Sequence, residues 1–244
     1  GDGTATTSGF FDEIRISKIG DGSGQSGQNW MLTELNNQNS PRTFYTIGGQ
    51  ENRTPSTMKF GTTVSADTKP GWYDPFSYRK KFTIPAKNVS GGSNLSNFPV
   101  LINHTDPDIR ITSFGGKSAS GSGEFIFTSS DGTTSIPYEI ETYSSSSGRF
   151  IGWVNVTTLS ATTNTDIYMY YGGAAAGAAT NQNKTGTWNS NYRGVWHLNE
   201  VVADEGSGAN NHIDSTSNAN HGDQSGNDDV NGKIVIAVDD ISSG

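Results

Sequence analysis

The stretch EFIFTSSDGTTSIPYEIETYSSSSGRFIGWVNVTTLSATTNTDIYMYYGG, residues 124–173, decides the fold class of this chain of 244 residues. Apolar and polar residues alternate in four short runs, which are residues 125–127, 136–143, 150–156 and 167–171. Segments rich in Asp, Gly, Ser, Thr and Asn separate the runs. Because side chains of a strand point alternately to its two faces, this pattern predicts a half-buried antiparallel meander.

Two further strands are predicted just before this stretch. WYDPFSYRKKFTI (72–84) alternates and is ended by Pro85, and FPVLINHT (98–105) carries Val100 and Ile102 on one face. Together the runs supply enough strands between residues 72 and 172 for two sheets that pack face to face. The predicted fold class is therefore all-β, an antiparallel β-sandwich of the jelly-roll or immunoglobulin-like kind.

Composition agrees with a loop-rich β protein. Gly accounts for 31 residues and hydrophobic residues for only 31%, so we expect a thin core. Aromatic residues make up 10% of the chain and recur inside the strand-like runs, which argues against disorder. The net charge is −8 and no basic patch follows the chain, which argues against nucleic acid and anionic membranes as partners.

Cysteine is absent, which excludes thiol catalysis, zinc–cysteine sites and covalently attached haem. Secretion stays open, because large extracellular domains do not need disulfides. No apolar run approaches the roughly 18 residues that cross a bilayer, so we expect no membrane insertion. The chain opens on GDGTATTSG and stops at ISSG, both loop-like, so we expect an excerpt of a longer exported protein whose signal lies elsewhere.

The first 51 residues predict three elements in order. FFDEIRIS (10–17) is a strand in which Phe10, Ile14 and Ile16 share an inward face with Asp12, held there by a structural hydrogen bond or by calcium. NWMLTELNNQ (29–38) is a short surface helix closed off before Pro41, and RTFYTIGGQE (42–51) is a strand.

This opening resembles the final stretch of the laminin-G-like, concanavalin-A-type sandwich domains of large microbial surface proteins. The carrying residues are FDEIRIS, WMLTELNNQNSP and TFYTIGG, in that order. Residues 194–244 resemble the beginning of such a domain, with GVWHLNE as its first strand, DSTSNANHGD as the next loop and GKIVIAVDD as the following strand. The resemblance implies a sandwich end at one terminus and a sandwich start at the other.

The middle of the chain resembles the family called domain of unknown function 2341. The carrying residues are WYDPFSYRKKFTI, FPVLI, FIFTSSDGTTSIPYEIE, WVNVTTLSATTNTDIYMYYG and TWNSNYRGVWHLNE, which together span residues 72–200. The family occurs in exported multi-domain proteins, often just before a laminin-G-like sandwich. The resemblance thus implies location and neighbours, and no chemistry.

These resemblances divide the chain into four ranges. Residues 1–51 are the C-terminal part of one laminin-G-like sandwich, 52–71 a linker, 72–193 the central sandwich, and 194–244 the N-terminal part of another laminin-G-like sandwich. Two explanations stay open. The chain is an excerpt of a long multi-domain protein, or it is a filament subunit whose last strands complete a sandwich with the first strands of the next copy.

No cluster of residues predicts catalysis, so we expect no enzyme. Glu139 and Glu141 face the same way on one strand, as paired glycosidase acids would, but a solvated strand face explains them more simply. The four histidines have no zinc spacing, and no GxSxG motif is present.

Two binding sites are predicted with a structural alternative beside each. Trp153, Tyr168 and Tyr170 are candidates for a carbohydrate-stacking platform, against the commoner role of core filling. Asp214 and Asn218, in an oxygen-rich loop, are candidate ligands of a structural calcium ion, against a turn that ties the loop to itself.

Sequons suggest glycosylation at Asn52, Asn88, Asn94, Asn103 and Asn183, while that at Asn155 lies in a predicted strand and is the least suited. The expected function is a non-enzymatic structural or adhesive module of an extracellular surface or filament protein. Its expected partners are copies of itself, neighbouring β-domains of the same protein, and glycans. The rival function is a carbohydrate-binding accessory module of a secreted glycan-degrading enzyme.

Overall fold

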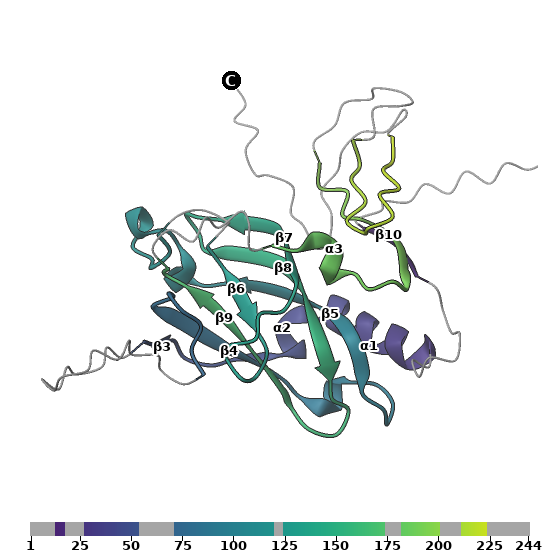
Figure 1. The fold of residues 1–244 in the computed structure, drawn as a ribbon, viewed down its shortest axis with the longest axis horizontal. Helices are drawn as coiled ribbons and strands as arrows, with labels where there is room; N and C mark the ends of the chain where they lie inside the picture. Colours follow the sequence, from purple (N-terminus) through teal and green to yellow (C-terminus); the bar gives the residue numbers. More distant parts are fainter. Residues whose placement is uncertain are drawn as a thin grey trace, which may run out of the picture. The chain divides into compact units, whose positions relative to one another are not determined.

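The computed structural model describes residues 13–17, 27–53, 71–119, 124–173, 182–200 and 211–223, and the following account concerns these residues. The chain forms two compact units (Figure 1). The sandwich unit is Ile19–Asn189, and the terminal unit combines Gly1–Lys18 with Ser190–Gly244. Among the helices in the described ranges, none has the length and apolarity to cross a membrane.

The sandwich unit consists of two antiparallel sheets, which confirms the predicted fold class. The first sheet has the order β2 (Thr46–Ile47), β4 (Tyr78–Ile84), β9 (Thr165–Tyr171), β6 (Ile126–Thr128), with β3 (Glu51–Asn52) also paired to β4. The second sheet has the order β5 (Leu95–Thr105), β8 (Arg149–Leu159), β7 (Tyr138–Ser144). Short helical turns lie between the strands, namely η1 (Ala86–Asn88), η2 (Pro107–Ile109), η3 (Thr112–Phe114) and α3 (Lys184–Thr187).

Aromatic side chains fill the space between the two sheets. Phe127 of β6 lies 5.8 Å from the ring of Phe150 on β8 and 5.2 Å from that of Tyr138 on β7. All three are fully buried, as are Phe82 and Ile84 on β4. The alternating sequence pattern predicted these strands because every second side chain of a strand faces the core and is therefore apolar.

The free edge of β5 is covered by the segment before the sandwich, α1 (Gly27–Asn39) and α2 (Pro41–Phe44), which lie beside β5 in Figure 1. Asn37 accepts a hydrogen bond from the Leu101 N–H (2.6 Å) and donates one to the Leu101 carbonyl (3.1 Å). The Tyr45 hydroxyl bonds the N–H and the carbonyl of Asn103 in the same way (2.9 and 3.0 Å). Two side chains thus satisfy the backbone groups that a neighbouring strand would otherwise bond.

The helix predicted at residues 29–38 is present, but the strand predicted at 42–51 is different. Residues 41–44 form α2, and only the short strands β2 and β3 follow. Because both pair with β4, residues 27–53 are part of the sandwich unit. Residues 27–51 were expected in a separate laminin-G-like piece, and residues 52–53 in a linker.

In the terminal unit, β1 (Ile14–Ser17) pairs with β10 (Tyr192–Trp196), with Ile14 opposite Trp196 and Ile16 opposite Gly194. On its other side β10 receives the hydrogen bond from the Ser215 N–H to the Val195 carbonyl (2.8 Å). The inward face predicted for Ile14 and Ile16 is wrong, because their exposed fractions are 37% and 52%. Phe10 and Asp12, expected on the same face, lie outside the described residues.

Candidate functional site

A cluster of charged side chains links the two sheets of the sandwich unit. Lys80 comes from β4 of the first sheet, and its Nζ contacts Oδ2 of Asp106, which follows β5 of the second sheet. The same Nζ lies 2.9 Å from Oδ2 of Asp108, whose Oδ1 is 3.1 Å from Nζ of Lys117. The side chains of Lys80 and Asp106 are only 11% and 5% exposed. We call Lys80, His104, Asp106 and Asp108 the inter-sheet cluster.

Local backbone geometry positions the acids of the cluster. Asp106 is the N-cap of η2, so its Oδ1 accepts the Asp108 N–H at 2.9 Å, and Pro107 occupies the first position of the turn. On the other side, Nε2 of His104 lies 3.6 Å from Oδ2 of Asp106. Asp106 therefore has a backbone donor at one oxygen and two cationic or polar side chains at the other.

Charge pairing decides the protonation of the cluster. Burial alone would raise the pKa of Asp106, but hydrogen bonds from His104, Lys80 and the Asp108 N–H outweigh it and hold that pKa far below its usual value. Burial would likewise lower the pKa of Lys80, and its bonds to Asp106 and Asp108 raise it instead. The pair rests as ammonium and carboxylate.

Sequence reasoning missed this cluster although the sequence carries a signal for it. In β4, Lys80 shares a face with Phe82 and Ile84, both of which are buried. A lysine at an inward position of an alternating strand needs a buried anion to pair with. The anion itself was not foreseeable, because it comes from the other sheet.

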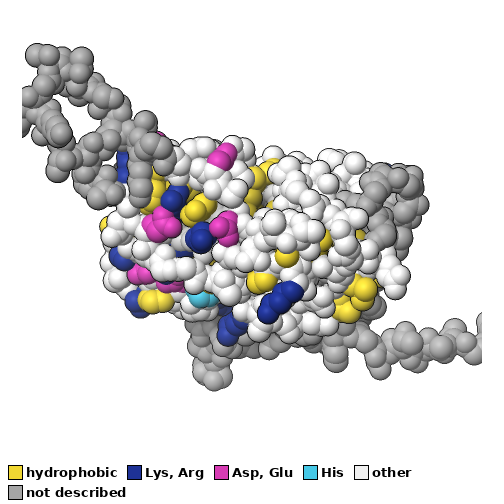
Figure 2. Space-filling view, turned by 90° about the horizontal axis from the view of Figure 1, so that it is seen from below, with side chains coloured by type: hydrophobic (Ala, Val, Ile, Leu, Met, Phe, Trp, Pro, Cys, Tyr) yellow, Lys and Arg dark blue, Asp and Glu magenta, His cyan; other side chains and the backbone are white. Residues whose placement is uncertain are grey.

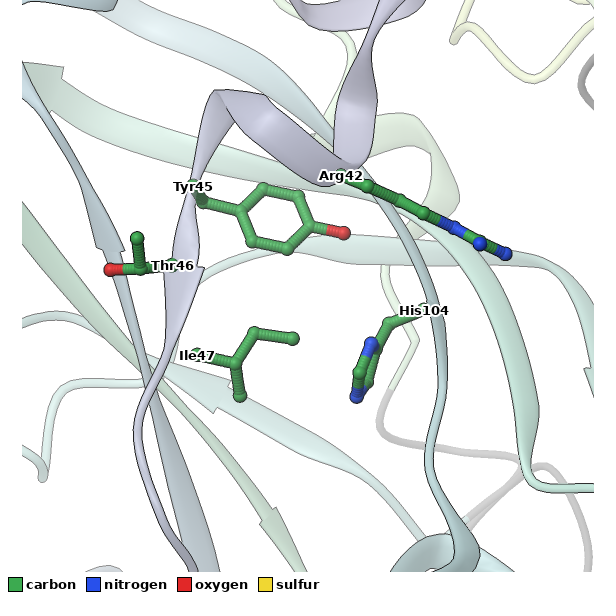
Figure 3. Close-up of a pocket in the computed structure, with 5 residues that line it drawn as sticks. All are labelled: Arg42, Tyr45, Thr46, Ile47 and His104. Atoms are coloured by element: carbon green, nitrogen blue, oxygen red, sulfur yellow. The ribbon is translucent and has the colours of Figure 1, made fainter.

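A cavity of about 360 Å³ opens beside this cluster, lined by Arg42, Tyr45, Thr46, Ile47 and His104 (Figure 3). The Tyr45 hydroxyl points toward the side on which Arg42 and His104 lie, and Ile47 gives the cavity an apolar wall. Burial raises the pKa of Tyr45 to about 12, so the phenol is neutral. Its hydroxyl group is hydrogen-bonded to the backbone of Asn103 on β5.

The predicted sugar platform is not formed. Trp153 and Tyr170 are both fully buried and come from different sheets. Tyr168 is half-buried, and the Arg79 guanidinium lies over its ring at 4.1 Å and over that of Trp72 at 4.6 Å. Arg79 also donates to the Tyr170 hydroxyl at 2.8 Å. These aromatic side chains follow the competing interpretation, core filling and packing around a cation.

The prediction that Glu139 lies on a solvated strand face is wrong, since its exposed fraction is 1%. Its Oε2 accepts the indole N–H of Trp188 at 2.8 Å, and Oε2 of Glu141 accepts that of Trp153 at 2.9 Å. The two indole rings are 5.3 Å apart. The β-bulge after Ile140 and the packing of Trp188 bury this face, and neither is visible in the local pattern.

Both carboxylate oxygens of Asp214, a predicted calcium ligand, accept hydrogen bonds from groups of the protein. Its Oδ1 accepts the N–H groups of Val195 and Thr216, and its Oδ2 accepts the Thr216 hydroxyl and the Asn220 N–H, all at 2.9 Å. Asn218 donates to the Tyr192 and Arg193 carbonyls. The bonds to Thr216 and Asn220 form the turn within the loop that was the alternative interpretation. The bonds to Val195, Tyr192 and Arg193 also join the loop to β10, which that interpretation did not include. No group of three or more metal-binding side chains occurs within the described ranges.

The predicted glycosylation sites differ in exposure. Three side chains are exposed, Asn52, Asn94 and Asn183, and two are half-buried, Asn88 and Asn103. The amide nitrogen of Asn88 donates to the Phe44 carbonyl at 2.8 Å. Asn155 is buried, with its amide bonded to the Gly186 and Thr187 carbonyls.

The fold thus defines an antiparallel β-sandwich domain. Residues 122–224 match the model of a family described as domain of unknown function, DUF2341, which confirms the expected resemblance over that segment. The match starts later than the expected residue 72 and extends beyond residue 200. No curated protein and no solved structure matches the chain, and the laminin-G-like resemblance of its two ends stays a prediction.

Proposed function

We propose that the chain is a non-enzymatic structural or adhesive module of an extracellular surface or filament-forming protein, and that it joins its neighbours by adding strands to the sheet of the terminal unit. The observation that carries the proposal is the pairing of β1 with β10. These strands come from opposite ends of the sequence, at residues 14–17 and 192–196, yet they belong to one sheet.

This sheet offers what strand addition requires. Two paired strands are marginally stable in water by themselves, and a third strand or a packed layer adds the missing stability. Ile14 and Ile16 expose apolar surface that such a layer would cover. Because β1 and β10 are far apart in sequence, β1 of one copy can pair with β10 of the next in the same register, as in strand exchange between protomers.

The cysteine-free sequence allows a direct test by mixing two single-cysteine variants. Ile14→Cys and Trp196→Cys place one thiol on each strand at positions that face each other in the observed register. If β1 of one molecule pairs with β10 of another, oxidation of the mixture yields the mixed dimer far more readily than either homodimer. Phe114→Cys, an exposed residue of η3, mixed with Trp196→Cys is the matched control.

The double variant Ile14→Cys/Trp196→Cys provides the opposing outcome. Oxidation that gives only monomers closed by an internal disulfide, at every protein concentration, together with no mixed dimer, would refute pairing between molecules. Electron microscopy of the concentrated wild-type chain then shows whether the exchange is propagated into fibres.

The rival function, a carbohydrate-binding accessory module, has less support. Two of the three aromatic residues on which it depended, Trp153 and Tyr170, are buried. On the face shown in Figure 2, acidic and basic side chains are intermingled over one part, and basic side chains alone lie near the lower edge.

A further inference from the structure

We propose that the inter-sheet cluster forms a covalent cross-link, an isopeptide bond between Nζ of Lys80 and Cγ of Asp106, which ties the two sheets of the sandwich unit together. This bond would form within one chain, whether or not the chain assembles with its neighbours. The reacting groups are in direct contact, and their side chains are only 11% and 5% exposed. Lys80 lies on β4 of the first sheet, and Asp106 directly follows β5 of the second sheet.

Proximity supplies the driving force for the condensation. An amine and a carboxylate in water do not condense, but well-oriented groups within one molecule reach effective concentrations of roughly 10⁵–10⁸ M. Residues 80 and 106 are 26 positions apart and each is fixed by its own sheet, so folding alone brings them together.

The cluster also places a catalytic group at each atom that changes. Asp108 Oδ2, 2.9 Å from Nζ, accepts a proton from the ammonium and leaves a neutral amine. The amine attacks Cγ of Asp106, and the negative charge that develops on Oδ1 is stabilised by the Asp108 N–H at 2.9 Å. His104, with Nε2 at 3.6 Å, delivers a proton to Oδ2.

Atoms and charges balance without any further reactant. The C–N bond forms and the bond from Cγ to Oδ2 breaks. One of the three protons of Nζ goes to Asp108, a second passes from the nitrogen to Oδ2 after the attack, and the third stays on the amide nitrogen. With the proton from His104, Oδ2 leaves as water. His104 is 31% exposed and regains its proton from solvent, to which Asp108 returns the one that it accepted. Because the resting state is the ion pair, the reaction is a slow maturation that follows folding.

The product fits the same surroundings. The amide oxygen, formerly Oδ1, still accepts the Asp108 N–H, and the amide N–H donates to the Asp108 carboxylate. Two buried charges disappear, which removes the cost of keeping them from water.

Intact-mass spectrometry of the purified, unfolded wild-type chain tests the proposal. The expected mass is lower than the sequence mass by one water molecule. Tryptic digestion is expected to yield a branched peptide in which residues 80–81 are joined to residues 88–110. A wild-type mass equal to the sequence mass, after prolonged incubation of the folded protein, would overturn the proposal.

Two conservative variants separate this bond from other losses of water, such as cyclisation at Asp131-Gly132. Lys80→Arg keeps the charge pair but cannot react, because a guanidinium stays protonated, and its mass is expected to equal its sequence mass. Lys117→Arg alters the other lysine beside Asp108 and is expected to stay one water short. A loss of water that persists in Lys80→Arg would also overturn the proposal.

Asp108→Asn tests the role given to the base. We expect this variant to accumulate the linked form at least tenfold more slowly than the wild type, measured as the ratio of the two masses over time after refolding. A rate equal to that of the wild type would overturn the part assigned to Asp108. If a variant fails to fold, the branched peptide of the wild type still decides whether the bond exists.

Discussion

Asn37 shows how much of this fold depends on single polar side chains. It is 1% exposed, and its amide group bonds both backbone groups of Leu101 on the edge of β5. A primary amide has a donor and an acceptor spaced like those of a peptide group, so it can bond the N–H and the carbonyl of one residue with separate atoms. The position therefore requires Asn for hydrogen bonding, although a helix interior does not favour it.

We expect Asn37→Ala to lower the free energy of unfolding by roughly 2–4 kcal/mol, because it leaves two buried backbone groups without their partner. Urea unfolding measures the change. Asn36→Ala, one position earlier on the exposed face of the same helix, is the matched control and should change stability by less than about 0.5 kcal/mol. Equal losses in the two variants would show that the edge of β5 does not need the amide.

Asp214 gives the terminal unit a dependence on pH. Burial alone would raise its pKa, but the hydrogen bonds from Val195, Thr216 and Asn220 outweigh burial and lower it. A carboxylate with a lowered pKa in the folded state stabilises the fold above its unfolded pKa of about 3.9 and loses that contribution as the pH falls.

We therefore expect Asp214→Asn to have a free energy of unfolding about 1–3 kcal/mol below that of the wild type at pH 6. This difference in stability should shrink steadily below about pH 4. Urea unfolding at a series of pH values measures it, with the exposed Asp223→Asn as control. A gap that does not change between pH 6 and pH 3 would mean that the ionised carboxylate contributes nothing.

At the scale of elements, the sequence predicts what is local and misses what is tertiary. Alternation of apolar and polar residues predicted β4, β5 and the strands from β6 to β9, because successive side chains of a strand point to opposite faces of the sheet. The helix at 29–38 was foreseeable from its residues, but its buried face was not. Trp30 and Asn37 are buried, while Met31 and Leu35 are about half exposed, because the helix packs against a polar strand edge and not a sheet face.

Because α1 buries Trp30 and leaves Leu35 about half exposed, substitution of Trp30 should lower stability far more than substitution of Leu35. Trp30→Ala should cost about 3–5 kcal/mol, since the indole is buried with its ring 4.6 Å from that of Phe98. Leu35→Ser should cost less than about 0.5 kcal/mol beyond its change in helix propensity. Thermal or urea unfolding of the two variants decides, and a large loss for Leu35→Ser would show that the apolar stripe of α1 is covered in solution.

The candidate sites were less predictable than the strands for the same reason. Core filling was correctly considered for the aromatic residues. The residues next to Trp153 in the sequence, however, do not indicate that its ring is buried and not exposed. The inter-sheet cluster combines residues from β4 and from the end of β5, and only the packing of the two sheets brings them together. Asp214, by contrast, lies in an Asx-type loop whose internal hydrogen bonds to Thr216 and Asn220 were foreseen as one of two alternatives, although its bond to Val195 of β10 was not.

At the scale of the whole molecule, exposure divides the sequons into two groups. In a host that glycosylates folded exported proteins, we expect glycans at Asn52, Asn94 and Asn183 and none at Asn155, because its amide is buried in hydrogen bonds. Asn88, whose amide is engaged with Phe44, should be occupied less than the exposed three. Glycopeptide mapping measures the occupancy, and modification of Asn155 in natively folded material would contradict the described packing.

The cover over β5 has a practical consequence for anyone who produces this protein in pieces. A recombinant fragment that begins at Trp72, the expected start of the central sandwich, would lack α1 and would present a bare, hydrogen-bonding edge along much of an eleven-residue strand. Such a fragment should precipitate or form cross-β aggregates, whereas one that begins at Gly27 should stay in solution.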